Sequence, residues 1–296
     1  MPRSLIWSLY ALNVIIWSST WVAIKIGLED VPPLLGAGVR FAFAGAALLA
    51  VARLLGRTLR TDVLLAIVLA LLPFAAAYGL IYWGEQYVPS GLAAVLFGVM
   101  PLYSATIASV ALADEPLRAR LVAGIAVAIG GLALAFGESL ALGHAEKALL
   151  AATACAVAPL AAAIGNVSIK RRGGALDPIA LNGWAMLGGG ALLLALSTVT
   201  EDWGAAAWSQ QAVGSVAYLA VIGSAVPFVT LTVLLRELPA VTVSYITLLL
   251  PFGALAFGAA LYDERITLVA LAGAMLVAAG LLIAQWPRRA RPALAA

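Results

Sequence analysis

The chain has 296 residues, of which 64% are hydrophobic and 10% are charged, and its formal net charge is +3. Soluble domains carry about 25% charged residues, so this composition excludes a large soluble core and indicates that lipid is the main solvent. A single cysteine, Cys155, and a single histidine, His144, exclude an intramolecular disulfide and a zinc site built from Cys and His within one chain. The basic residues form short scattered clusters, which do not indicate nucleic acid as a partner.

Ten apolar segments are long enough to cross a bilayer, which takes about 20 residues of helix. We expect these helices over residues 5–27, 34–55, 63–83, 90–112, 119–137, 148–168, 178–199, 211–235, 240–262 and 266–286. The connections between them are too short to form a soluble domain. The first segment is too long for the apolar region of a signal peptide, so we expect it to be retained. The predicted fold is all-α and integral to the membrane, with ten transmembrane helices.

The lysines and arginines favour one orientation of these helices. With the N-terminus in the cytoplasm, most of the 17 basic residues fall in cytoplasmic segments, whereas the outer loops hold only Lys147 and Arg265. The outer loops are acidic instead. Because basic residues are enriched in cytoplasmic loops, the sequence predicts that both termini lie in the cytoplasm.

Two stretches of the chain share one pattern, namely a proline, an apolar run with a second proline, and an acidic pair. They extend from Pro89 to Glu115 and from Pro239 to Glu264, with the prolines repeating at an offset of 150 residues and the acidic pairs, Asp114-Glu115 and Asp263-Glu264, at 149. Earlier positions repeat at an offset of 145, where Lys25, Pro33, Gly45 and Ala46 correspond to Lys170, Pro178, Gly190 and Ala191. Such self-similarity indicates that the chain contains two copies of one structural unit.

The repeat predicts how the chain is divided. Residues 1–140 and 146–287 would each form a five-helix repeat, and residues 288–296 would form a basic cytoplasmic tail. Since five is odd, the two copies must cross the membrane in opposite directions. Inverted repeats of this kind are typical of transporters, because two similar halves can rock to open a central site to either side.

The motif from Trp17 to Lys25, the two stretches with paired prolines and the five-plus-five arrangement together resemble the drug/metabolite transporter superfamily, EamA type. Within it, the chain is most similar to bacterial inner-membrane exporters of amino acids, including aromatic ones. The resemblance implies a carrier that moves a metabolite out of the cytoplasm through a central cavity lined by both halves. It also implies location in the bacterial inner membrane.

Two prolines, Pro101 and Pro251, lie in the middle of expected helices. Each removes a backbone N–H and clashes with the carbonyl four residues earlier, at Phe97 and Thr247. We interpret both as hinges beside the cavity, because the break recurs at equivalent positions. The alternative is a static packing kink.

Aromatic and polar residues within the helices are the candidates for binding a substrate. An aromatic face suits an apolar or aromatic substrate, and hydroxyl and amide groups could orient a zwitterion. The alternatives are helix packing, interhelical hydrogen bonds and an aromatic belt at the membrane surface. The candidate substrate-binding residues are Asn13, Trp17, Thr20, Tyr78, Tyr82, Tyr103, Asn166, Phe228, Ser244 and Thr247.

Lys25 and Arg40 are the basic residues expected within the spans, near the outer ends of the first two helices. A charge in the membrane is costly, so a functional role such as holding a substrate carboxylate is the first hypothesis. The alternatives are extension to the membrane surface or pairing with Glu29, Asp30 or Glu85. No Asp or Glu is expected in the middle of a span, so we predict downhill export without a carboxylate relay.

The sequence therefore predicts an exporter of small metabolites, most of all amino acids with aromatic or apolar side chains, that works by alternating access. It would need no cofactor, metal or nucleotide, since the chain has no phosphate-binding loop, and its partners would be the substrate and the lipid bilayer. Two alternatives remain, an exporter of other metabolites or drugs and an intramembrane enzyme. An enzyme would need a base, nucleophile or metal cluster that the sequence does not display.

Overall fold

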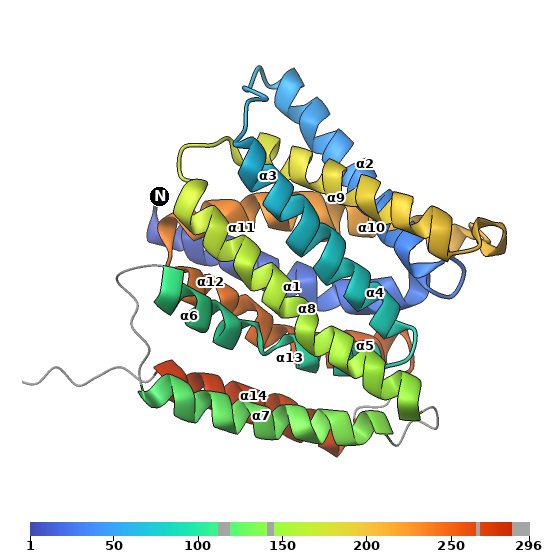
Figure 1. Ribbon diagram of the computed structural model, residues 1–296, viewed down its shortest axis with the longest axis vertical. Coiled ribbons are helices and arrows are strands. Elements are labelled where there is room, and N and C mark those ends of the chain that lie inside the picture. Colours follow the sequence, from blue (N-terminus) through green and yellow to red (C-terminus); the bar gives the residue numbers. More distant parts are fainter. Residues whose placement is uncertain (112–118, 141–144, 265–266, 286–296) are drawn as a thin grey trace, which may run out of the picture.

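The structure, a computed structural model, describes residues 1–111, 119–140, 145–264 and 267–285. These residues form a bundle of roughly aligned helices without a strand (Figure 1). The acidic pair Asp114-Glu115, His144, Arg265 and the tail 288–296 lie outside the described residues. The helices are α1 (Arg3–Gly27), α2 (Pro33–Leu54), α3 (Val63–Leu69), η1 (Ala70–Ala77), α4 (Tyr78–Glu85), α5 (Ser90–Phe97), α6 (Met100–Ala111), α7 (Ala119–Leu140), α8 (Ala145–Arg172), α9 (Pro178–Thr200), η2 (Trp203–Ala205), α10 (Gln210–Ala220), η3 (Val221–Ala225), α11 (Val226–Glu237), α12 (Ala240–Ser244), α13 (Ile246–Leu261) and α14 (Leu268–Gln285).

Eight helical stretches of the described chain are long and apolar enough to cross a membrane, which confirms the predicted all-α membrane fold. They are Arg3–Gly27, Pro33–Leu54, Val63–Glu85, Ser90–Ala111, Glu146–Arg172, Pro178–Thr200, Gln210–Glu237 and Ala240–Leu261. The helices α7 and α14 cover the two remaining predicted segments and lie side by side along one edge of the bundle (Figure 1).

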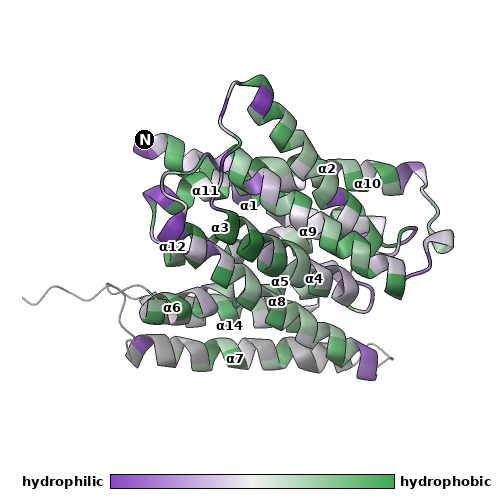
Figure 2. Cartoon of the chain, turned by 45° about the horizontal axis from the view of Figure 1, so that its top comes forward, coloured by the Kyte–Doolittle hydropathy of each residue, from purple (hydrophilic) through white to green (hydrophobic). Residues whose placement is uncertain are grey.

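The distribution of side chains is that of a protein in lipid. Hydrophilic residues gather at the ends of the helices, whereas the middle of the bundle is hydrophobic (Figure 2). Large apolar side chains face outward from several helices, for example Ile15 with 63% of its surface exposed and Phe43 with 57%. Lipid tails stabilise such side chains, whereas the backbone polar groups are satisfied within each helix.

Two of the spans contain a π-helical segment, a feature that the apolar pattern does not predict. η1 interrupts the span Val63–Glu85 and contains Pro73, and η3 interrupts Gln210–Glu237 just before Pro227. A proline cannot donate the hydrogen bond that an α-helix requires, and a wider π turn accommodates the loss. Such turns leave carbonyl groups free to accept other donors.

Two other spans are broken, but not at the prolines. The first break is the turn at Gly98 and Val99 between α5 and α6, and the second is at Tyr245 between α12 and α13. Pro101 is the second residue of α6, where a proline fits because the first helical N–H groups have no partner. Pro251 lies inside α13. The first turn directly follows Phe97, whose carbonyl Pro101 would crowd, and the second lies just before Thr247. The hinge role of the two prolines stays a prediction.

Ion pairs join loops at the end of the bundle that carries the N-terminus. Arg57 binds Asp177 and Arg172 binds Asp62, each with an N–O distance of 2.9 Å. Asp62 also accepts a hydrogen bond from the backbone N–H of Leu65, and Asp177 accepts one from the backbone N–H of Ile179 and another from that of Ala180. Each aspartate therefore caps a helix with one oxygen and binds an arginine with the other.

This geometry predicts a loss of stability in acid. The backbone N–H of Leu65, and after it Arg172, hold the pKa of Asp62 below its ordinary value. Burial raises the pKa of Asp177, but Arg57 and the backbone N–H groups of Ile179 and Ala180 together lower it by more. Because the pKa values are lower in the folded state, stability is present above the unfolded pKa near 3.8 and is lost as the pH falls through the folded values. The double variant Asp62→Asn/Asp177→Asn should therefore lose less stability in acid than the wild type. We expect a smaller change of its unfolding free energy, measured in detergent, between about pH 5 and pH 2. An unchanged slope would show that neither pair contributes.

Candidate functional site

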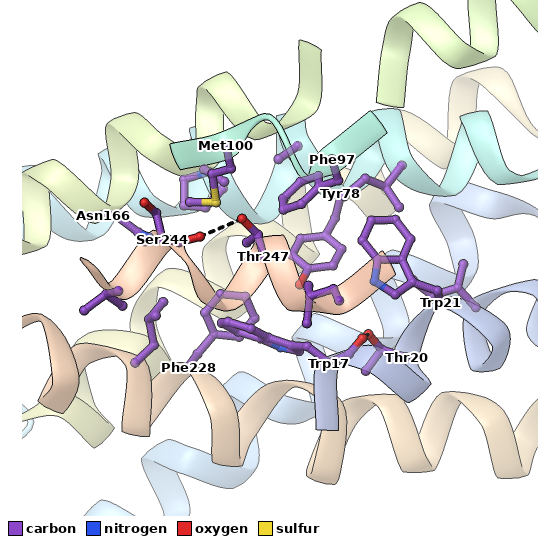
Figure 3. Close-up of a pocket in the computed structure, with 18 residues that line it drawn as sticks. Trp17, Thr20, Trp21, Tyr78, Phe97, Met100, Asn166, Phe228, Ser244 and Thr247 are labelled. Carbon is purple, nitrogen blue, oxygen red and sulfur yellow. Dashed lines mark hydrogen bonds between the residues drawn. The ribbon is translucent and has the colours of Figure 1, made fainter. Parts of the chain in front are cut away.

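A cavity lies between the helices about halfway along their length (Figure 3). Residues of α1, η1, α4, α5, α6, α8, α11, α12 and α13 contribute to its walls. The volume open to the centres of water-sized spheres is about 60 Å³. The lining residues are Trp17, Thr20, Trp21, Ile24, Pro73, Ala77, Tyr78, Ile81, Phe97, Met100, Ala162, Asn166, Phe228, Leu231, Val243, Ser244, Thr247 and Leu250.

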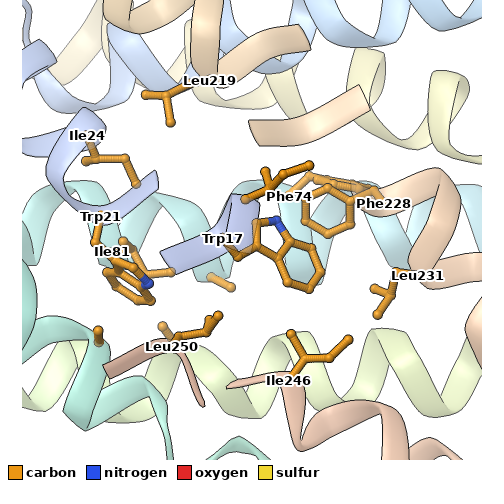
Figure 4. Packing of buried hydrophobic residues seen from close by; sticks show 14 of the residues in the cluster. Trp17, Trp21, Ile24, Phe74, Ile81, Leu219, Phe228, Leu231, Ile246 and Leu250 are labelled. Carbon is orange, nitrogen blue, oxygen red and sulfur yellow. The ribbon is translucent and has the colours of Figure 1, made fainter. Parts of the chain in front are cut away.

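Aromatic rings form most of one wall. Trp17 lies edge-on to Phe228 with 5.2 Å between the ring centroids, and Tyr78 lies edge-on to the same ring at 6.1 Å. Trp21 meets Phe97 in the same way at 5.5 Å. Edge-to-face pairs in this distance range attract one another beyond the burial of their surface. Figure 4 shows Trp17 and Phe228 packed among apolar side chains, so the aromatic wall continues into the core.

A small number of polar groups faces the same cavity. The hydroxyl of Thr247 donates to the carbonyl of Ser244, and the hydroxyl of Thr20 donates to the carbonyl of Trp17, so both are satisfied by their own chain segment. The amide of Asn166 has no hydrogen-bond partner among the described residues, although the residue is only 7% exposed. Asn166 is therefore available to a ligand, as is the indole N–H of Trp21, which also lines the cavity and has no hydrogen-bond partner among the described residues.

Seven of the ten candidate substrate-binding residues line this cavity, namely Trp17, Thr20, Tyr78, Asn166, Phe228, Ser244 and Thr247. The structure places the other three elsewhere, bonded to protein groups. The amide of Asn13 donates to Thr230, the hydroxyl of Tyr82 accepts from Arg40, and the hydroxyl of Tyr103 donates to the carbonyl of Ala156. Helical spacing had put these residues on plausible faces, but it could not show which neighbouring helix those faces meet.

Several lining residues were not among the sequence candidates, most of all Trp21, Phe97 and Met100. A signal for all three was present in the repeat, since Trp21 lies 145 residues before Asn166. Phe97 and Met100 lie 150 residues before Thr247 and Leu250, which line the cavity as well. Pairing every candidate with its repeat partner would have found Trp21 from Asn166 and Phe97 from Thr247.

Arg40 is buried behind the aromatic wall and does not line the cavity. Its side chain is fully buried and donates to Ser224, to the hydroxyl of Tyr82 at 3.2 Å and to the carbonyl of Gly223 at 3.2 Å. The guanidinium carbon also lies 4.8 Å from the ring centroid of Tyr78. Because Gly223 and Ser224 are both part of η3, the π turn supplies two of the three acceptors that hold this charge.

Lys25 does not line the cavity either. Its ammonium group donates to the backbone carbonyls of Glu85 at 2.5 Å and Val88 at 3.2 Å, which lie at and just beyond the end of α4. The contact ties α1 to the connection between α4 and α5. The alternatives named for Lys25, extension to the membrane surface and pairing with a carboxylate, did not include this contact with backbone carbonyls.

Glu85 corrects one sequence-based expectation. The expected helix over residues 63–83 puts Glu85 in the outer loop that follows, but Glu85 is the last residue of α4 and its exposed fraction is 0%. A carboxyl group is thus buried within one of the spans. Among the described residues, no group of three or more His, Cys, Asp and Glu is arranged to hold a metal ion.

The model of the EamA-like transporter family matches the chain twice, over residues 5–137 and 149–285. Among similar curated proteins, the uncharacterized transporter YoaV of Bacillus subtilis (strain 168) is 31% identical over 91% of this chain and 92% of its own length. The uncharacterized inner membrane transporter YedA of Escherichia coli (strain K12) is 32% identical over 80% of this chain and 76% of its own. A probable amino-acid metabolite efflux pump of the same strain is 29% identical over 96% of this chain and 95% of its own.

The double match of the family model covers most of the chain, and the helices that it spans enclose a cavity with an aromatic wall. The family model and the relatives are both named as transporters. The several membrane-spanning helices agree with this description. The chain belongs to the EamA-like transporter family.

Proposed function

We propose that this protein exports amino acids with aromatic or apolar side chains from the cytoplasm by alternating access. The observation that carries the proposal is the cavity at mid-depth, which combines an aromatic wall with the unpartnered amide of Asn166. Rings bind apolar or aromatic side chains, and an amide can bind the carboxylate or ammonium group of an amino acid. The relative named as a probable amino-acid metabolite efflux pump supports this substrate class.

The proposal includes two inverted five-helix repeats, over residues 1–140 and 146–287, and contacts between α2 and α9 support it. A Cβ atom on Gly45 would lie 2.4 Å from the backbone nitrogen of Leu187 and 2.7 Å from the carbonyl of Gly183. A Cβ atom on Gly190 would lie 2.4 Å from the nitrogen of Ala42 and 2.9 Å from the carbonyl of Gly38. Three pairs of these positions are 145 residues apart, namely Gly38 with Gly183, Ala42 with Leu187, and Gly45 with Gly190.

Such a reciprocal contact is what a twofold axis across an antiparallel helix pair produces. The same relation holds for α7 and α14. A Cβ atom on Gly131 would approach the carbonyl of Gly273 to 2.6 Å, and one on Gly280 would approach the carbonyl of Gly124 to 2.5 Å, with both pairs of equivalent positions 149 residues apart. An axis perpendicular to these helices would lie in the plane of the membrane, as inverted repeats require.

Equivalent residues of the two repeats also meet at the cavity. The pairs are Trp17 with Ala162, Trp21 with Asn166, Tyr78 with Phe228, Ile81 with Leu231, Phe97 with Thr247, and Met100 with Leu250. A binding site on the axis that relates two halves is the arrangement from which both sides of the membrane can be reached by rocking. The paired residues differ in chemistry. The first repeat contributes the rings of Trp17 and Trp21, whereas the second contributes Ala162 and the amide of Asn166 at the equivalent positions.

The volume of the cavity supports a conformational change during transport. About 60 Å³ for the centres of water-sized spheres corresponds to roughly four to six water molecules, since one needs about 10–15 Å³. An aromatic amino acid is larger, so the helices must separate to admit it. We propose that Pro101 and Pro251, with the turns that precede them, act as the hinges.

Orientation and location form part of the same proposal. The distribution of lysine and arginine favours both termini in the cytoplasm, and the relative YedA, named as an inner membrane transporter, favours the bacterial inner membrane. The basic residues 288–296 would then form a cytoplasmic tail. Export of other metabolites or drugs remains the alternative within the family. The flux experiment below distinguishes it from export of amino acids.

The test is flux of labelled amino acids from liposomes that contain the purified protein. We expect the fastest flux for aromatic and large apolar amino acids, and Asn166→Leu should lower it by about 10-fold or more because a hydrogen bond to a charged group contributes about 1.5–3 kcal/mol. Thr153→Ala, in an exposed position of the same helix, is the matched control and should leave the flux unchanged. Flux of no amino acid, with flux of other metabolites, would contradict the proposed substrate.

A further inference from the structure

Glu85 is a buried carboxyl group without a hydrogen-bond partner. Its exposed fraction is 0%, and neither carboxyl oxygen has a partner within the part of the chain that the structure describes. Two other carboxylates at the same end of the bundle do have hydrogen-bond donors. Glu201 accepts from the backbone N–H groups of Leu34 and Leu35, and Glu264 accepts from the N–H and hydroxyl of Ser90.

The cations near Glu85 are engaged with other acceptors. Lys25 on α1 donates to two backbone carbonyls, and Arg40 on α2 donates to Ser224, Tyr82 and Gly223. The other titratable groups that act on this site are Cys155 on α8, Glu264 after α13 and Tyr82 on α4 itself.

An ionised carboxylate that is buried without a donor is unfavourable by several kcal/mol even when charges lie nearby. A neutral carboxylic acid avoids most of this cost, because it carries no charge and lacks only hydrogen-bond partners for its O–H and C=O groups. The packing shown here is therefore compatible with the protonated form of Glu85 and opposes the ionised form.

The second half of the chain shows that packing does not require this carboxyl group. The position 150 residues later is Leu235, which is also 0% exposed. The contact beside it recurs as well, since Lys170 donates to the carbonyl of Leu238 as Lys25 donates to that of Val88. The two ends are thus built alike, and a titratable group occurs in only one of the two positions.

We propose that Glu85 is a proton-binding site that is occupied when α1, α4 and α8 are packed as they are here. When this end of the bundle opens, water reaches the carboxyl group, the O–H bond breaks, and the proton passes to water while the carboxylate remains. Closure takes the proton back from the same side. The inference rests on the proposed alternating access, and it means that opening of this end releases one proton from Glu85.

The first test does not require transport. In infrared spectra of the detergent-solubilised protein at about pH 8, where exposed carboxyl groups are ionised, a carboxylic-acid carbonyl band should remain, and it should be missing from the spectrum of Glu85→Gln. Glu146→Gln, an exposed carboxylate on α8, is the matched control and should keep the band. A band that survives in Glu85→Gln, or a wild-type protein without one, would overturn the proposal.

The second test uses flux from liposomes at varied pH on the side that Glu85 faces. Above the pKa of a water-exposed glutamate, about 4.3, the open population should rise by up to about 10-fold per pH unit, because opening releases one proton. Glu85→Gln and Glu85→Leu should remove this dependence, and Leu235 indicates that leucine fits such a position. A variant profile identical to wild type would refute the site, whereas absence of any flux with the infrared band present would count only against the proposed transport.

Discussion

Gly45→Ala should largely prevent folded protein from accumulating in the membrane, and Gly190→Ala should do the same. A methyl group at Gly45 would lie 2.4 Å from the backbone nitrogen of Leu187, and one at Gly190 would lie 2.4 Å from that of Ala42. A backbone atom cannot rotate away as a side chain can, so α2 and α9 would have to separate. Overpacking costs about 1–3 kcal/mol in a typical core, and we expect at least the upper end of that range here.

Two other glycines provide matched controls. A Cβ atom at Gly130 on α7, or at Gly214 on α10, would meet nothing within 4 Å. Alanine at these positions should stabilise the helices by about 0.5–1 kcal/mol, because glycine loses more conformational entropy on folding. The measurement is the yield of monodisperse protein after extraction, followed by unfolding in detergent. Normal yield and stability of Gly45→Ala would show that α2 and α9 do not approach this closely.

Arg40 supplies the second large effect, and the expected order of the variants is unusual. Arg40→Lys should destabilise the protein by about 3–5 kcal/mol, and Arg40→Met should destabilise it less. The guanidinium group binds three acceptors in different directions and lies against the ring of Tyr78, which a single ammonium group cannot reproduce. Lysine would leave a buried charge with too few acceptors, whereas methionine fills a similar volume and carries no charge.

The comparison needs an arginine of the same helix that is not buried. Arg53 lies on α2 and is exposed, so Arg53→Lys and Arg53→Met should each change the unfolding free energy by no more than about 0.5 kcal/mol. Unfolding by denaturant in mild detergent, followed by tryptophan fluorescence, measures all four variants. If Arg40→Lys were as stable as the wild type, water would have to reach the guanidinium group.

Much of the helix layout could be predicted from residue type alone. The eight spans agree with the apolar segments to within a few residues, because a bilayer demands about 20 consecutive apolar residues wherever a helix crosses it. The repeat was visible as well, since glycines and prolines at spacings of 145 and 150 are readable without a structure. Among the candidate site residues, Trp17, Tyr78 and Asn166 were chosen for polarity and aromaticity within a span, and all three line the cavity.

The misses concern features that depend on a partner helix or on backbone geometry. Tyr103 has the same chemical character as Tyr78, yet it faces a carbonyl of α8 instead of the cavity. The helix breaks lie at Gly98 and Tyr245, a few residues before each proline, and residue type alone does not give these positions. The burial of Glu85 could not be inferred, because hydropathy assigns a carboxylate at the end of a helix to the loop that follows.

The sequence by itself determined that the chain is a helical membrane protein with an internal repeat, because both conclusions depend on patterns along the chain: apolar length and periodic recurrence. Only the tertiary structure decided which side chains share the cavity, which acceptors hold Arg40 and which carboxyl group is buried without a partner. The physical reason is that burial and hydrogen bonding are properties of neighbouring helices, and residues such as Trp17 and Phe228 become neighbours only when segments more than 200 positions apart pack together.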